Sequence, residues 1–205
     1  MKSMIQEIIE IYNDSGQQPW SDPEFPADDT ALYIDHLNPP DYADSSPNVQ
    51  WLRPQQIYTG QDEPLMMKDG LKPGDVKQGI LGDCWLLGSF LCLATNPDLL
   101  KNLIYYDGIK EGFSVFQFFK NGKWQFVVVD TRIPCTDNKT PLYGHCTDPQ
   151  EFWVPLIEKA YAKLHGNYEI LNGGKMVEGM VDLTGGVSEK YNLKAPETRE
   201  LLENG

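Results

Sequence analysis

The segment 78–94, QGILGDCWLLGSFLCLA, decides how the rest of the chain is interpreted. From Asp83 to Ala94 it is apolar on nearly every side, which predicts a helix buried all round at the centre of its domain. Gly79 and Gly82 give the loop before this helix room to bend. The Asn-Pro pair at 96–97 ends the helix, and a second short helix is expected to begin at Pro97.

Downstream, GFSVFQFFK (112–120) and WQFVVVDT (124–131) predict two strands. Asn121-Gly122 joins them and is the strongest short signal for a hairpin. After a loop at 134–150, a helix is expected from about 149 to 164, with a stripe formed by Phe152, Leu156, Ala160 and Leu164. Strands and helices do not alternate as βαβ units, so the sequence predicts an α+β fold with a small antiparallel hairpin or sheet.

Upstream, residues 4–12 have the apolar spacing of an amphipathic helix, which ends before Gly16. Residues 17–70 are rich in Pro, Asp and aromatics and predict an extended wrap held by Trp20, Phe25, Tyr33 and Trp51. We therefore expect an N-terminal helix at 1–16, one globular unit at 17–195, and the start of a linker at 196–205.

The bulk composition narrows the possible partners and compartment. The 205 residues carry a net charge of −13, which disfavours nucleic acid and anionic membranes as partners and suits hard cations. Four cysteines show no CxxC spacing, so a disulfide framework or a zinc site is not expected. The N-terminus lacks the uninterrupted apolar run of a signal peptide, and no run is long enough to span a membrane. We expect a cytoplasmic protein with reduced thiols.

Cys84 is the candidate nucleophile. It would lie in the first turn of the apolar helix, where backbone N–H groups and the helix dipole stabilise a thiolate. Gln78 could fold back beside the sulfur and, with the Cys84 N–H, form an oxyanion hole. The alternative is that a cysteine in an apolar helix is a small buried hydrophobe, and we assign that role to Cys92. Neither Cys135 nor Cys146, both in loops, has an activating neighbour in sequence.

The motif QGILGDCWLL resembles the active-site segment of the calpain family and, more distantly, that of papain-type proteases. Four further segments resemble calpain segments in the family's order: SDPEFPADDTALYID, VQWLRP, FWVPLIEKAYAKLHGNYEILNGG and VDLTGGVSE. The resemblance covers roughly residues 18–190 and implies the first, nucleophile-bearing lobe of a papain-like protease core. It also implies a calcium-dependent cysteine endopeptidase that cleaves protein substrates, with Cys84 as nucleophile and Gln78 as oxyanion donor.

The family resemblance further implies a calcium site in this lobe. Its ligands would be the carbonyls of Lys68 and Gly70 and the carboxylates of Asp75 and Glu151, which are oxygen ligands of the kind that Ca²⁺ binds. The alternative is that the two acids are ordinary surface carboxylates. Pro73 departs from the family pattern, where an arginine that pairs with the second lobe is common.

The catalytic base is not evident in the sequence. His36 falls in the wrap, His145 in a loop, and His165 at a helix end where capping is its expected role. None lies in a segment that resembles the calpain histidine or asparagine motif, so a second lobe is expected to supply both residues, and the chain alone to be inactive. Two alternatives stay open: a non-enzymatic binding or scaffold module, and another papain-type activity such as deubiquitination or transglutaminase-like transfer.

Overall fold

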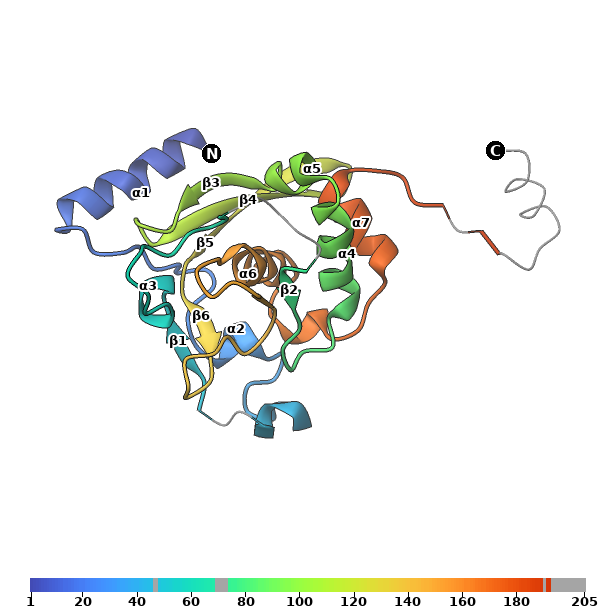
Figure 1. The fold of residues 1–205 in the computed structure, drawn as a ribbon, viewed down its shortest axis with the longest axis horizontal. Helices are drawn as coiled ribbons and strands as arrows, with labels where there is room; N and C mark the ends of the chain where they lie inside the picture. The colour runs from blue at the N-terminus through green and yellow to red at the C-terminus, as the bar shows by residue number, and fades with distance from the viewer. Residues whose placement is uncertain (46–47, 69–73, 190, 193–205) are drawn as a thin grey trace.

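The computed structural model describes residues 1–45, 48–68, 74–189 and 191–192 (Figure 1). The α-helices are α1 (Lys2–Asp14), α2 (Asp29–Leu32), α3 (Pro54–Ile57), α4 (Cys84–Ala94), α5 (Pro97–Lys101), α6 (Trp153–His165) and α7 (Met176–Thr184). Two short 3₁₀ helices are η1 (Asp41–Ser45) and η2 (Glu169–Leu171). The strands are β1 (Gln50–Leu52), β2 (Val76–Lys77), β3 (Ile104–Gly108), β4 (Phe113–Lys120), β5 (Lys123–Asp130), β6 (Ile133–Cys135) and β7 (His145–Cys146).

The strands form three small antiparallel sheets, ordered β3-β4-β5, β1-β6 and β2-β7. The predicted hairpin is confirmed, because β4 pairs with β5 along its whole length and Lys120 lies opposite Lys123. Asn121 and Gly122 have φ angles of 53° and 76°, the backbone that a two-residue turn of the primed type requires. The mixed helices and antiparallel sheets agree with the predicted α+β class.

Helix α6 lies at the centre of the molecule, where Figure 1 shows it nearly end-on among the other elements. Every residue from Trp153 to Ala162 is buried. The prediction that helix 84–94 would hold this place was wrong, since Cys84 and Cys92 of α4 are exposed on one face while Leu86 and Phe90 are buried on the other. The sequence was misleading because α6 carries charged residues whose partners come from distant segments.

Helix α4 packs against α6 through aromatic contacts. The rings of Phe90 and Trp153 lie 6.2 Å apart, and those of Trp85 and Tyr161 lie 6.1 Å apart. The outer side of α4 lies beside α7, as Figure 1 shows. The sequence analysis did not predict α7, and it placed the start of α6 four residues too early, because residues 149–152 bond to the segment around Leu65 before the helix begins.

The described part of the predicted wrap, residues 17–45 and 48–68, lies against the core, although it also contains α2, η1, β1 and α3. Phe25 and Tyr33 are buried, Trp20 packs edge-on against Phe113, and β1 pairs Trp51 with Pro134 of β6. These aromatic contacts fix the wrap to the body of the molecule, as predicted.

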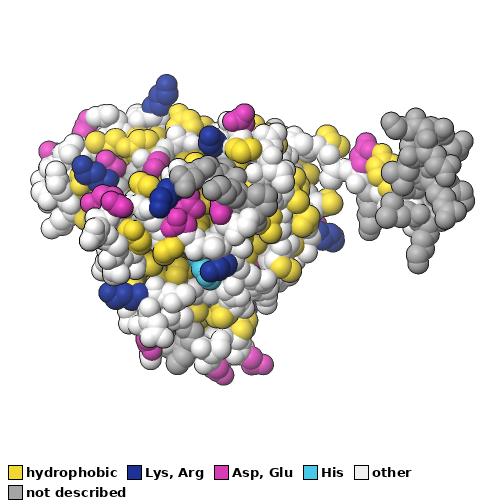
Figure 2. Space-filling view, in the orientation of Figure 1, with side chains coloured by type: hydrophobic (Ala, Val, Ile, Leu, Met, Phe, Trp, Pro, Cys, Tyr) yellow, Lys and Arg dark blue, Asp and Glu magenta, His cyan; other side chains and the backbone are white. Residues whose placement is uncertain are grey.

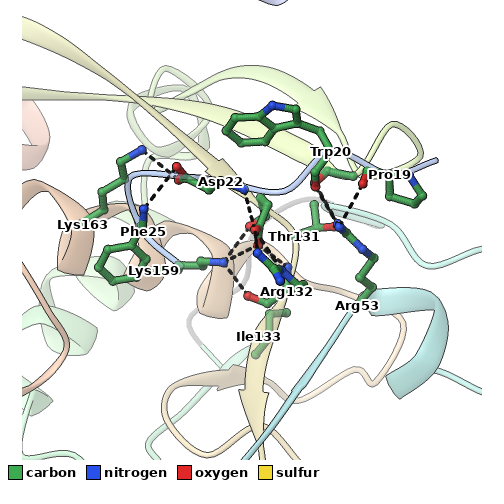
Figure 3. A network of polar contacts seen from close by, with 12 residues as sticks. Pro19, Trp20, Asp22, Phe25, Arg53, Thr131, Arg132, Ile133, Lys159 and Lys163 are labelled. Carbon is green, nitrogen blue, oxygen red and sulfur yellow. Dashed lines mark hydrogen bonds and ion pairs between the residues drawn. The ribbon is translucent and has the colours of Figure 1, made fainter. Parts of the chain in front are cut away.

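A polar network also holds the wrap in place (Figure 3). The fully buried Asp130 accepts from Lys159 Nζ at 2.6 Å, from Arg132 Nη2 at 2.6 Å, and from the backbone N–H of Asp22 at 2.9 Å. Lys163 Nζ in turn lies 2.8 Å from the Asp22 carboxylate. Burial alone would raise the pKa of Asp130, but the two cations outweigh it and hold that pKa at about 2.

Arg53 extends this network to the other end of the wrap. Its guanidinium donates to the backbone oxygens of Pro19 and Trp20 (Figure 3). It also donates to the backbone oxygen of Gly112, which lies at the start of the hairpin. Because a planar guanidinium carries five donors in a fixed geometry, one side chain can join these separate segments.

Helix α1 confirms the predicted N-terminal helix and lies apart from the main core. Its Ile8 packs on the outer face of the sheet against Phe113, Val115 and Val128, which form a separate small cluster. Among the described residues, no helix is long and apolar enough to cross a bilayer. The linker expected at 196–205 lies outside the described residues.

Candidate active site

Cys84 is the first residue of α4, and its side chain is exposed. The loop that leads to it needs glycine at two positions. A Cβ on Gly79 would lie 2.2 Å from the Leu142 carbonyl oxygen, and one on Gly82 would lie 2.4 Å from Oδ1 of Asn172. The loop therefore passes so close to its neighbours that side chains are excluded, which fixes the start of the helix.

Two hydrogen bonds of the Gly82 backbone connect this loop to the segment before α7. The Gly82 N–H donates to the side-chain oxygen Oδ1 of Asn172 at 3.1 Å, and the Gly82 carbonyl accepts from the Gly173 N–H at 2.8 Å. Trp85 adds a third contact, since its Nε1 donates to the Leu171 carbonyl at 2.9 Å and its ring covers Gly174. Asn172 was not predicted as part of the site, because no local sequence signal points to it.

Gln78 is exposed and lies on the same loop, and its Nε2 donates to the Leu81 carbonyl at 2.8 Å. This bond folds the side-chain amide back along the loop toward the start of α4. An amide nitrogen carries two hydrogens, so one N–H of Gln78 is left after this bond. An exposed sulfur at a helix N-terminus and a side-chain amide on the preceding loop are groups that acyl transfer uses.

Asp83 and Glu158 form a buried acidic pair directly beneath this site. Asp83 precedes Cys84 and is fully buried, and Glu158 of α6 is 1% exposed. Both Glu158 oxygens accept from the Gly144 N–H, at 3.1 and 3.0 Å. Burial raises the pKa of both carboxyls, and for Glu158 the charge of Asp83 adds to the effect. Neither residue was predicted as part of the site.

Each of the three histidines lies elsewhere in the described structure. His165 ends α6, where its ring contacts Tyr161 and its Nε2 lies 3.8 Å from Asp182 Oδ2, while Gly166 closes the helix. His145 Nδ1 lies 3.0 Å from the Tyr143 carbonyl, and His36 is exposed in a turn. Among the described residues, none of the three has a hydrogen bond or ion pair with Cys84.

The other cysteines differ in exposure. Cys92 is exposed, so the prediction that it is a buried hydrophobe was wrong; it lies eight residues after Cys84 on the same exposed face of α4. Cys135 and Cys146 are buried, and burial raises the pKa of the Cys135 thiol to about 12. All four thiols are free.

The structure brings Asp75 and Glu151 to the same region, around the loop that precedes α6. The Asp75 carbonyl accepts from the Thr147 N–H at 2.9 Å, and Glu151 Oε1 accepts from the Lys68 N–H at 2.6 Å. Burial raises the pKa of the Cys146 thiol, and the charges of Glu151 and Asp75 raise it further. Figure 2 shows acidic side chains gathered over this part of the surface.

Gly70 and Pro73, which the sequence analysis placed in the same region, lie outside the described residues. Within the ranges that the structure describes, no group of three or more His, Cys, Asp or Glu side chains is placed so that it could hold a metal ion. Carboxylate oxygens are donors of the kind that a hard cation binds, so the chemistry of Asp75 and Glu151 fits calcium.

Comparison with known proteins gives a consistent result. Residues 20–204 match the family model described as calpain family cysteine protease. The chain is 41% identical over 194 residues to the calpain-1 catalytic subunit of Gallus gallus, covering 90% of this chain and 27% of that protein. It is 39% identical over 181 residues to the human calpain-2 catalytic subunit, covering 86% of this chain and 25% of that protein. It is 36% identical over 210 residues to the calpain-type cysteine protease DEK1 of Arabidopsis thaliana, covering 100% of this chain and 10% of that protein.

Proposed function

Because the chain belongs to the calpain family of cysteine proteases, we propose that it carries the nucleophile of a calcium-dependent endopeptidase core. The chain spans about a quarter or less of the length of the curated relatives described above, so the activity of the whole enzyme is part of the proposal. The observation that carries it is the exposed Cys84 thiol at the N-terminus of α4, with Gln78 folded back along the preceding loop.

In this proposal the Cys84 thiolate attacks the carbonyl carbon of a substrate peptide bond. The oxyanion that forms accepts from the Cys84 N–H and from the Gln78 amide. The C–N bond then breaks, and a histidine of the second lobe, oriented by an asparagine, protonates the leaving amine. Water hydrolyses the thioester that remains. The outer side of α4 and α7, where Figure 2 shows apolar side chains, supports a role for this side of the molecule in meeting another lobe.

The test combines the chain with the second core lobe of a calpain, with calcium, and measures cleavage of a fluorogenic peptide. Cys84→Ala should abolish cleavage, whereas Cys92→Ala, which changes an exposed cysteine on the same helix, should leave it unchanged. Gln78→Ala should lower kcat by about 10²–10³-fold, the usual cost of removing one oxyanion donor.

The controls separate this proposal from its rivals. The chain alone should be silent, since among the described residues no histidine pairs with Cys84. Cleavage by the chain alone that Cys84→Ala abolishes would mean that a base lies within this chain. Absence of cleavage in every combination would favour the non-enzymatic binding module.

Four free thiols support a reducing, cytoplasmic compartment for the protein.

We further propose that Asp75 and Glu151 bind calcium together with the backbone carbonyls of Lys68 and Gly70. The position of both carboxylates around the loop before α6 supports this site. When bound, the ion would supply a fixed charge that orders these segments. Calcium should raise the Tm, since a ligand that binds only the folded state stabilises it by roughly 2.7 kcal/mol at 100 times Kd.

The calcium test needs matched variants. Asp75→Asn and Glu151→Gln should each reduce the rise in Tm, while Glu7→Gln, on the exposed face of α1, should preserve it. A Tm that calcium does not change would contradict the site.

A further inference from the structure

The side chain of Asp83 does not make the hydrogen bond that its position at the start of α4 predicts. Asp83 is the N-cap of α4, where aspartate side chains commonly accept from a first-turn N–H. Here only the Asp83 backbone carbonyl serves the helix, accepting from the N–H groups of Leu86 at 2.8 Å and Leu87 at 3.1 Å. The carboxyl group makes no capping bond and is turned into the core.

The side chain that Asp83 meets in the core is Glu158. Neither carboxyl oxygen of Asp83 accepts a hydrogen bond from a described residue, although both oxygens are buried. The two carboxyls lie within hydrogen-bonding reach of each other. Ionised carboxyls only accept, so a hydrogen bond between these two groups requires a proton. One proton would give the buried Asp83 oxygens a partner.

Comparison with Asp130 shows why the proton is needed. Both aspartates are fully buried, but Asp130 has Lys159 and Arg132 as partners, and its pKa is lowered. Among the described residues, no lysine or arginine pairs with Asp83 or Glu158, and their pKa values are raised. Two buried like charges without a cation are costly, and the removal of one charge by a shared proton is the usual solution.

The titratable groups around the pair do not supply a compensating charge. Tyr143, from the loop between β6 and β7, and Tyr168, after α6, face Glu158, and burial raises the pKa of both hydroxyls. His145 on β7 directs Nδ1 to the Tyr143 carbonyl. Lys159, next to Glu158 on α6, turns to Asp130 and to the Arg132 carbonyl. The proton must therefore stay on the pair itself.

We propose that Asp83 and Glu158 share one proton at neutral pH, and that this carboxyl pair positions Cys84 by holding the N-cap side chain away from the first turn of α4. The backbone N–H groups of Cys84 and Trp85 then have no acceptor among the described residues, and they are left for a substrate oxygen. A capping carboxylate would occupy such an N–H and place a negative charge beside the sulfur. The positioning role rests on the proposed function, whereas the shared proton does not.

The proton is tested by the pH dependence of stability. The raised pKa values mean that the native pair keeps a proton that unfolded carboxyls release above about pH 4, so the free energy of unfolding of the wild type should fall as pH rises from there through the native pKa. Asp83→Asn and Glu158→Gln replace the shared proton with an amide N–H and should lose this slope. Glu7→Gln, which removes one exposed carboxyl, should keep it.

Urea unfolding across this pH range measures the slope, and infrared spectroscopy at neutral pH detects the C=O stretch of a protonated carboxyl directly. That band should be present in the wild type and in Glu7→Gln, and absent from both amide variants. Equal slopes in the wild type and the amide variants, or a wild type without the band, would overturn the shared proton.

The positioning role is tested by iodoacetamide alkylation of Cys84, with Cys92 as the internal reference. Asp83→Asn and Glu158→Gln should leave the Cys84 rate unchanged. Glu158→Leu removes the partner of Asp83 and frees the Asp83 carboxylate to cap α4. The alkylation rate of Cys84 should then fall by roughly two- to fivefold, which is the effect of one charge at a helix end. Asp83→Asn added to Glu158→Leu should restore the rate.

A Cys84 rate that Glu158→Leu leaves unchanged would overturn the positioning role. If Glu158→Leu does not fold, the slope and the infrared band of the two amide variants still decide the proton. Neither assay measures proteolysis. A chain that shows the slope but yields no cleavage with any second lobe would refute the proposed function and leave the carboxyl pair intact.

Discussion

Thiol exposure at individual residues gives the first prediction. Cys84 and Cys92 are exposed, while Cys135 and Cys146 are buried, so a thiol reagent should modify two of the four cysteines in the native chain and all four in urea. Cys84 should react faster than Cys92, because it lies at the N-terminal end of the α4 dipole and Cys92 lies in the last turn. Mass spectrometry of the peptides after timed alkylation measures both rates; equal rates would argue against activation by the helix.

The buried ion pair gives the second prediction at this scale. Lys159→Met removes a fully buried cation that contacts Asp130 and should destabilise the fold by about 3–5 kcal/mol, the cost of leaving a buried charge without its partner. Lys175→Met is the matched control, since its pair with Glu178 is exposed and exposed pairs contribute about 0–1 kcal/mol. Urea unfolding of both variants measures the difference, and equal losses would contradict the assignment.

Single residues also show where sequence interpretation reaches its limit. The positions of Cys84 and Gln78 could be predicted because a helix start and its preceding loop are local features. Asp83 and Glu158 could not, because they are 75 positions apart in the sequence and nothing local to either one indicates the other. The same holds for Lys159, whose burial depends on Asp130 at the end of a strand in another part of the chain.

At the scale of elements, the hairpin gives the third prediction. Gly122 has a φ of 76°, where a side chain is strained, so Gly122→Ala should destabilise the protein by roughly 1–2 kcal/mol. Gly74→Ala is the control, since its Cβ would meet no atom of a described residue within 4 Å and its φ is outside the left-handed region. Thermal unfolding of the two variants compares them; a control that loses as much as Gly122→Ala would mean that the turn backbone is not the cause.

The elements that the sequence predicted well are those with strong local signals. Helices α1, α4 and α5 and the β4-β5 hairpin have clear periodicity, stop signals or an Asn-Gly turn. The strands β1, β2, β6 and β7 are two or three residues long, and they form only because distant segments lie side by side. That α6 rather than α4 is the central helix could not be predicted for the same reason, because burial of the charged residues of α6 depends on partners from distant segments.

At the scale of the whole molecule, α1 gives the last prediction. Deletion of residues 1–16 would expose Phe113, Val115 and Val128 but leave the main core intact. The chain should stay folded and lose about 3–6 kcal/mol, because α1 contributes two buried apolar side chains, Ile8 and Tyr12, at roughly 1.5–3 kcal/mol each. It should also associate more readily, which analytical ultracentrifugation and urea unfolding can measure. Complete unfolding on deletion would mean that α1 belongs to the main core.

Because α1 packs on a small cluster that is distinct from the main core, it can separate from the sheet before the rest of the protein unfolds. A helix that rests on one face of a sheet through a few side chains can detach while the rest of the chain keeps its native packing. Amide hydrogens of Lys2–Asp14 should therefore exchange with solvent through a sub-global opening, and those of α6 only through global unfolding. Of the helices that the structure describes, α1 would then be cleaved by another protease before α6.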